Sequence, residues 1–172
     1  ENNPPNLSTN KFAGGVTFDD KFGICGMEVL PDIGKLHAYK SYFMFDNEIV
    51  CLGSDINSSD SVQVETIVEN RKLSSADDVL SINGTFKTGE QEEFTGVKWA
   101  SIEGKHADIG YYFPETATIK ALKENRKGNW NHVATATNNV TYYADYATMW
   151  IEHGENPNNE SYQYVILPDM DS

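Results

Sequence analysis

The sequence has almost no helical periodicity, and this feature limits the fold more than any other. Short strand-like segments recur instead, separated by turn signals such as Asn83-Gly84, which accepts the positive φ angles of a type I′ turn. The expected strands are residues 11–18, 22–30, 35–45, 48–56, 62–71, 78–83, 97–103, 107–113, 117–124, 142–152 and 161–167. About ten strands at hairpin spacing, without a βαβ rhythm, predict an all-β antiparallel sandwich.

The segment KSYFMFDNEIVCLGS (40–54) predicts a hairpin of an unusual kind. Two apolar runs, 42–45 and 49–52, flank the turn-like pair Asp46-Asn47. A strand with one wet face alternates apolar and polar residues, and these runs do not alternate. Continuous apolar runs are typical of strands that are covered on both faces, so we expect a further layer over this hairpin.

The chain has 172 residues, which predicts one domain: a polar linker at 1–10 and a single β-sandwich at 11–172. Acidic residues number 26 and basic residues 13, a formal net charge of -13. So negative a chain is not expected to bind nucleic acid or anionic membranes, and it contains no apolar run long enough to span a bilayer.

Cys25 and Cys51 lie within apolar runs, which favours buried thiols over a disulfide between neighbouring strands and leaves the redox compartment open.

Candidate chemistry is sparse. None of the four histidines stands in a nucleophile motif, and His37 and His153 are expected to be structural. The stretch SDINSSD (54–60) offers oxygen donors but lacks the glycine and closing glutamate of a calcium loop, so we expect a solvated turn, and we expect no metal or other cofactor. Glu65 and Glu69 are expected on one face of their strand, where they meet water or pair with nearby cations.

Aromatic residues are frequent and are mostly expected in the core. Trp130 is the exception, because it lies in the polar stretch KGNWNH and is therefore expected to be exposed or at a contact.

Several segments in order resemble one family. AGGVTFDD, KSYFMFDNEIVCLGS, VETIVENRKL, IGYYFP and EHGENPNNESYQYVILP are similar to the β-sandwich region of the family 8 polysaccharide lyases, over residues 11–169. The resemblance implies a secreted or periplasmic bacterial enzyme that cleaves uronic-acid polysaccharides by β-elimination. It also implies stacked sheets and a catalytic α/α-toroid as the partner domain, with the catalytic residues on that toroid.

No family catalytic residue matches a position in this chain, so the chain alone is expected to be inactive, with Glu65 as the one carboxylate held in reserve. The first hypothesis is an architectural segment that supports the cleft and contacts an anionic glycan through Asn70, Arg71 and Trp130. The alternative is a free-standing carbohydrate-binding sandwich, and a third possibility is an interaction module without glycan affinity. The resemblance places the 42–52 hairpin inside a stack of sheets. Where the covering layer is missing, that face is expected to be open and to favour a homodimer.

Overall fold

The computed structural model describes residues 9–87, 89–104, 108–132 and 139–168. Most of the linker expected at 1–10 therefore lies outside the described residues. The described part is built from strands and one 3₁₀ turn, η1 (Trp130–His132). The strands are β1 (Ala13–Phe18), β2 (Phe22–Val29), β3 (His37–Met44), β4 (Ile49–Asn57), β5 (Gln63–Lys72), β6 (Val79–Ile82), β7 (Thr85–Lys87), β8 (Glu92–Glu103), β9 (Ile109–Asn129), β10 (Thr141–Glu155) and β11 (Glu160–Pro168).

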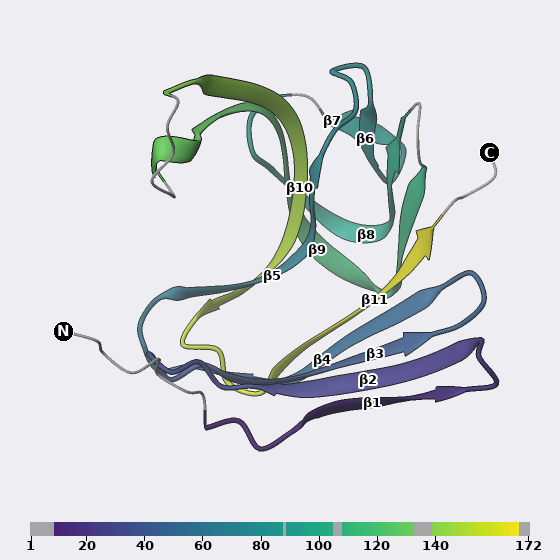
Figure 1. Ribbon diagram of the computed structural model, residues 1–172, viewed down its shortest axis with the longest axis vertical. Helices are drawn as coiled ribbons and strands as arrows, with labels where there is room; N and C mark the ends of the chain where they lie inside the picture. The colour runs from purple at the N-terminus through teal and green to yellow at the C-terminus, as the bar shows by residue number, and fades with distance from the viewer. Residues whose placement is uncertain (1–8, 88, 105–107, 133–138, 169–172) are drawn as a thin grey trace.

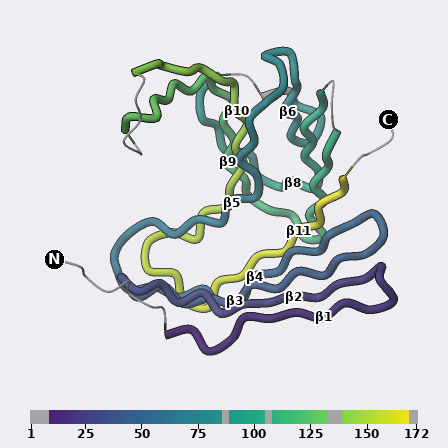
Figure 2. Tube along the Cα trace, viewed as in Figure 1, coloured from purple at the N-terminus to yellow at the C-terminus, as the bar shows by residue number. Residues whose placement is uncertain are grey.

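All strands belong to one antiparallel sheet of 11 strands, with the order β1-β2-β3-β4-β11-β9-β8-β6-β7 and with β10 and β5 branching from β9. Figure 1 shows that this sheet bends into two layers. We call β1–β4 the lower layer and β5–β10 the upper layer; β11 runs between them (Figure 2). The all-β, antiparallel sandwich expected from the sequence is confirmed.

The turn chemistry of the β6–β7 hairpin is as predicted. Asn83 (φ 48°) and Gly84 (φ 80°) both have positive φ, and Ile82 pairs with Thr85 on either side of them. The Asn83 side chain accepts hydrogen bonds from the amides of Lys98 (3.0 Å) and Trp99 (3.1 Å), which ties the turn to β8.

Two strand predictions were wrong in extent. Residues 107–113 and 117–124 were expected as separate strands around Pro114, but β9 is continuous over 21 residues. Pro114 is tolerated because residues 113–116 have no partners in the β8–β9 register. Residues 92–96 were expected in a loop, yet β8 begins at Glu92; a register shift between Phe94 and Val97, with Gly96 at φ 66°, hides its alternation.

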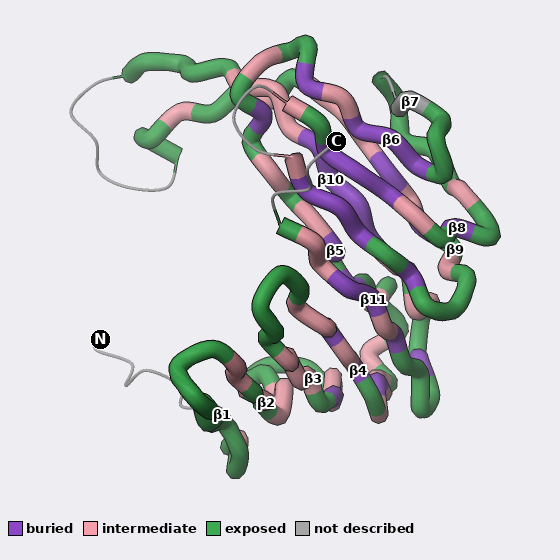
Figure 3. The backbone as a smooth tube through the Cα atoms, turned by 90° about the vertical axis from the view of Figure 1, so that its right-hand side faces the viewer, coloured by how far each residue is buried: buried purple, intermediate pink, exposed green. Residues whose placement is uncertain are grey.

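The hydrophobic core lies mainly in the upper layer and at its junction with β11. Figure 3 shows the buried stretches gathered in β6, β8, β9, β10 and β11, with β1 exposed throughout. Tyr111, Phe113, Leu80 and Ile82 are fully buried, and the Phe113 ring lies 6.3 Å from that of Tyr164 on β11. These contacts join the two layers.

The β3–β4 hairpin is covered on one face only. On the inner face Cys51 is 1% exposed, between Tyr42 and Tyr164 in the register. The other side, which we call the outer apolar face, consists of Val16, Phe18, Phe22, Ile24, Phe43 and Phe45. Phe18 is 73% and Val16 65% exposed, so this face is open in the chain, as expected where a covering layer is missing.

The cysteines are free thiols, and Cys51 is buried while Cys25 is half-buried. Cys25 pairs with Tyr42, and Tyr42 pairs with Cys51, so a whole strand separates the two sulfurs. Strands two places apart are about 10 Å from each other, farther than a disulfide spans.

Among the described residues no helix has the length and apolar character needed to cross a membrane.

Candidate functional site

Two of the predicted glycan contacts, Asn70 and Trp130, come together at the far end of the upper layer. They line a hollow of about 650 Å³ formed by the end of β5, the last residues of β9, η1 and the first half of β10. The hollow is lined by Asn70, Lys72, Arg126, Lys127, Gly128, Asn129, Trp130, Tyr142, Tyr143, Ala144 and Tyr146. We call it the Trp130 pocket.

Strand register builds most of this pocket from one face of the upper layer. Along β10, Tyr142 lies opposite Gly128 and Ala144 opposite Arg126, while Tyr146 lies opposite Lys72 of β5. Directly paired residues of antiparallel strands point to the same side, and so do alternate residues along a strand. Residues separated by more than fifty positions in the chain therefore share one surface.

Small residues make the surface concave. A Cβ atom added to Gly128 would meet nothing within 4 Å, and the neighbouring Ala144 has only a methyl group. Bulky aromatic side chains stand beside them, with Trp130 62% and Tyr142 49% exposed. Exposed aromatic faces beside a shallow floor are suited to stacking against a flat apolar face of a sugar.

Arg126 is held in a fixed position by the residues around it. Its Nε donates to Glu124 Oε1 (2.6 Å), one terminal nitrogen donates to Asn70 Oδ1 (2.8 Å), and the other donates to Thr148 Oγ1 (2.8 Å). The guanidinium carbon lies 4.6 Å from the centre of the Tyr146 ring, a cation–π contact. Arg126 thus orients the Asn70 amide and the Tyr146 ring.

The pocket is positive in a very negative chain. Its lining includes Lys72, Arg126 and Lys127 and no carboxylate, whereas the whole chain has a net charge of -13. Arg126 is paired with Glu124, but neither lysine ammonium has a hydrogen bond or ion pair to another described residue. The two lysines are therefore the groups free to meet an anion.

Arg71 lies on the other face of β5. It is adjacent to Asn70 in an extended strand, so its side chain points the opposite way. There its Nε donates to Glu69 Oε2 (3.2 Å), and the Tyr111 hydroxyl donates to the same oxygen. Tyr111 is 0% exposed, and burial followed by the contact with Glu69 raises its pKa. The Tyr-Glu-Arg cluster is therefore buried at its Tyr111 end and partly exposed at Arg71.

The reserve candidate Glu65 is far along β5 from the pocket. It pairs with Glu152, whereas Glu69 pairs with Met149. The expectation that Glu65 and Glu69 share a face was wrong, because a register shift between Met149 and Trp150 leaves one extra residue in β5 and reverses the alternation. Glu65 is exposed and has no contact with the pocket lining.

His153, which was expected to be structural, contacts the neighbouring strand β5 and lies outside the Trp130 pocket. The Thr66 hydroxyl and His153 Nε2 form a hydrogen bond of 2.8 Å, and burial lowers the pKa of His153. Within the ranges that the structure describes, no group of three or more His, Cys, Asp or Glu side chains is placed to hold a metal ion.

Comparison with known proteins gives consistent matches along nearly the whole chain. Residues 2–172 match the model of the polysaccharide lyase family 8 super-sandwich domain. The chain is 42% identical to the xanthan lyase of Bacillus sp. strain GL1 over 161 residues, which is 88% of this chain and 17% of that protein. The chain belongs to polysaccharide lyase family 8.

Other family 8 members agree with this assignment. The chain is 36% identical to chondroitinase-AC of Pedobacter heparinus, over 93% of this chain and 22% of that protein. The structure of a Paenibacillus xanthan lyase superposes with a TM-score of 0.88 at 43% identity, covering 93% of this chain and 16% of that chain. The chain thus spans about a fifth of the length of the family 8 relatives that it matches.

Proposed function

We propose that the chain is the β-sandwich segment of an extracellular bacterial enzyme that cleaves uronic-acid polysaccharides by β-elimination. Its own role is to support the cleft and to contact the anionic glycan through the Trp130 pocket. The observation that carries this proposal is a basic, aromatic hollow, without a lining carboxylate, on a chain of net charge -13. Asn70 and Trp130 are contacts in this proposal, and Arg71 belongs to the supporting face.

The cleavage itself is assigned to another part of a longer protein, the α/α-toroid. β-Elimination next to a uronate needs a base for the C5 proton and a group that neutralises the carboxylate. The pocket offers cations for the second task and tyrosine hydroxyls, but no imidazole or carboxylate lines it to take up a tyrosine proton. Glu65 is too remote to serve it.

The outer apolar face supports the architectural half of the proposal. Contiguous exposed apolar surface of this kind is typical of a protein interface. In the longer enzyme, this face contacts another part of the protein. In the isolated chain, the same face forms the interface of a homodimer. In sedimentation experiments the chain is expected to dimerise with rising concentration, and Phe18→Ser to stay monomeric. A monomer at all concentrations would contradict the dimer.

The alternative is a free-standing carbohydrate-binding module that stacks sugars on the exposed aromatic side chains of the Trp130 pocket. The cleft-supporting segment and the free-standing module are expected to differ in their affinity for the glycan. A module that acts alone needs useful affinity by itself, whereas a cleft-supporting segment is expected to bind weakly.

The pocket is tested by titrating the chain with hyaluronan, chondroitin sulfate and xanthan oligosaccharides, with tryptophan fluorescence as the readout; the chain has three tryptophans, and a signal from the pocket is the part that is lost in Trp130→Ala. Trp130→Ala, followed by calorimetry, is expected to weaken binding about tenfold, which corresponds to a loss of about 1.4 kcal/mol from the aromatic contact. Gly128→Val is expected to abolish binding, because the valine side chain occupies the floor of the pocket. Lys72→Gln is expected to weaken binding and to reduce its salt dependence.

The matched control is Gly14→Val on exposed β1, where an added Cβ likewise meets nothing within 4 Å. It is expected to fold and bind like the wild type. Unchanged binding in Gly128→Val would reject the pocket. In the same samples the ultraviolet absorbance of an unsaturated uronate is expected to stay flat, and a rise would show that the chain itself is catalytic.

A further inference from the structure

The side-chain amide of Asn70 is held in one orientation at the wall of the Trp130 pocket. Its oxygen, Oδ1, accepts a hydrogen bond from Arg126 (2.8 Å) and a second one from the Thr148 hydroxyl (3.3 Å). Arg126 also donates to Thr148 Oγ1 (2.8 Å), so the three side chains form a closed set of contacts. A guanidinium has only donors, so the Asn70 atom that faces it is the oxygen. The amide NH2 group therefore lies on the other side.

The strand register brings these three residues together. Thr148 of β10 lies opposite Asn70 of β5, and Arg126 of β9 lies opposite Ala144 of β10. Directly paired residues of antiparallel strands point to the same side of the sheet. Because Ala144 has only a methyl group, the Arg126 side chain can extend across β10 and reach β5. The orientation of the Asn70 amide is thus determined by three neighbouring strands.

The NH2 group of Asn70 is left without a protein partner. Among the described residues nothing accepts a hydrogen bond from it, although the amide oxygen has two donors. Asn70 is exposed and lines the Trp130 pocket, so the NH2 group is the polar part of this side chain that a ligand can reach. Asn70 therefore presents a donor to a ligand and keeps its acceptor for the protein.

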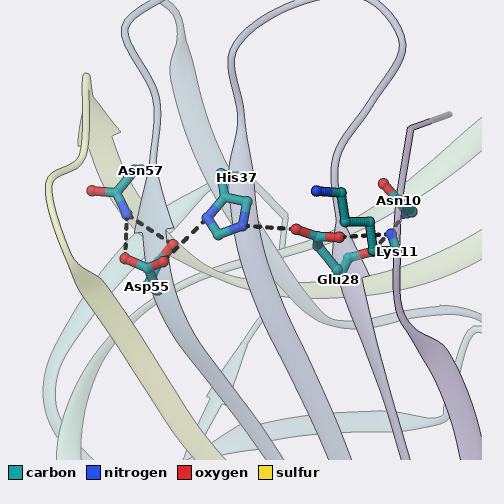
Figure 4. A network of polar contacts seen from close by, with 6 residues as sticks. All are labelled: Asn10, Lys11, Glu28, His37, Asp55 and Asn57. Carbon is teal, nitrogen blue, oxygen red and sulfur yellow. Dashed lines mark hydrogen bonds and ion pairs between the residues drawn. The ribbon is translucent and has the colours of Figure 1, made fainter.

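The amide of Asn57 provides a contrast, because both of its ends are used within the fold. Figure 4 shows its network in the lower layer, where Asn57 Nδ2 donates to Asp55 Oδ1 (2.6 Å) and Asp55 faces His37. The Asn57 oxygen accepts the main-chain N–H of Asn159 (2.8 Å). Asn57 and Asp55 belong to β4, where the sequence predicted a solvated turn. That network has a structural role, whereas the Asn70 network ends in a free donor.

Lys72 adds a positive charge beside this donor. It follows Asn70 by two residues in β5, so the two side chains share a face and their Cα atoms are about 7 Å apart. No carboxylate is among the described lining residues, and the Lys72 ammonium has no ion pair within the described ranges. The nearby carboxylate of Glu124 is paired with Arg126 (2.6 Å). An amide NH2 group and an ammonium both donate, so together they suit a group that only accepts, such as a carboxylate.

We propose that Asn70 is the specificity-determining residue of the Trp130 pocket, and that its NH2 group and the Lys72 ammonium bind the carboxylate of a uronate ring. This inference rests on the proposed function and deepens it, because the carboxylate is the anionic group that every uronic-acid polysaccharide carries. Arg126 is a positioning residue, which prevents the Asn70 amide from turning its oxygen toward the glycan. Trp130 contacts the apolar face of a sugar and does not distinguish a uronate from a neutral ring.

Asn70→Asp is the direct test, because aspartate has the same shape as asparagine. The aspartate keeps an oxygen for Arg126 and Thr148, but a negatively charged oxygen replaces the NH2 group. The variant is expected to bind hyaluronan oligosaccharides about a hundredfold more weakly than the wild type, because like charges then face each other. Hyaluronan carries no sulfate, so the carboxylate is its only anionic group. Carboxyl-reduced hyaluronan oligosaccharides, which are neutral, are expected to bind the variant and the wild type equally, as measured by NMR titration of the tryptophan indole signals.

Two further variants separate charge from position. Gln63→Glu is the matched control, since it makes the same change of charge at an exposed site of β5 outside the pocket. It is expected to bind both glycans as the wild type does. Arg126→Lys keeps the charge but removes the guanidinium hydrogen bonds, and it is expected to reduce the preference for the native over the carboxyl-reduced glycan. A merely structural role of Arg126 would weaken the binding of both glycans equally.

The outcomes distinguish this inference from the proposed function. If Asn70→Asp binds native hyaluronan like the wild type, or loses both glycans alike, Asn70 does not read the carboxylate, while the pocket itself still stands if Trp130→Ala weakens binding. The unmodified chain gives a test that needs no variant, because equal affinity for the native and the carboxyl-reduced glycan would also overturn the inference. If the wild type binds neither glycan, the inference and the glycan contact of the pocket are both wrong.

Discussion

Replacing Phe113 with alanine is expected to lower the free energy of unfolding by about 3–5 kcal/mol. Phe113 is 0% exposed, and its ring contacts Tyr164 where the upper layer meets β11. Truncation removes the buried ring and leaves a cavity between the two layers. Chemical denaturation monitored by tryptophan fluorescence measures the change.

The adjacent residue provides the control. Tyr112 is 42% exposed and lies on the opposite face of β9, so Tyr112→Ala is expected to cost far less. Similar losses for the two variants would mean that the core is not where the structure places it.

Gly53→Ala is the second substitution expected to destabilise the fold strongly, because there is no space for a side chain at this position. A Cβ atom at Gly53 would lie 2.0 Å from Cε1 of the Tyr162 ring. Tyr162 is 8% exposed and stacks on Tyr164 with ring centres 5.8 Å apart, so it has little room to move. The expected loss is about 1–3 kcal/mol, measured in the same denaturation experiment.

Gly14→Ala is the matched substitution, because no atom lies within 4 Å of its added Cβ. It is expected to be neutral or slightly stabilising, since alanine restricts the unfolded chain. If Gly53→Ala were equally harmless, the close approach of β4 and β11 at this point would be wrong.

Local chemistry made much of the fold predictable. The Asn83-Gly84 turn follows from the positive φ angles that this pair accepts, and the strand periodicity identified a segment for each long strand. The errors lie where alternation is interrupted. Pro114 looked like a strand end although β9 passes through it, and the irregularity before Val97 hid the start of β8.

The site was less predictable, because it depends on pairing between distant segments. Trp130 was found from its polar surroundings, but nothing local relates Arg126, Tyr146 and Lys72, which meet only through the register of β5, β9 and β10. One available signal was missed. Asn70 and Arg71 are neighbours in a strand, so they could not both face the same ligand.

The continuous β9 has a consequence for how the Trp130 pocket is placed relative to the lower layer. One end of this strand pairs with β11 beside the lower layer, and the other carries Trp130 and the pocket floor. The backbone forms one strand from Ile109 to Asn129, although residues 113–116 have no partners in β8. A neighbouring domain that contacts the outer apolar face would therefore be connected to the Trp130 pocket through β11 and β9. The position of that domain would determine the orientation of the pocket toward a polysaccharide.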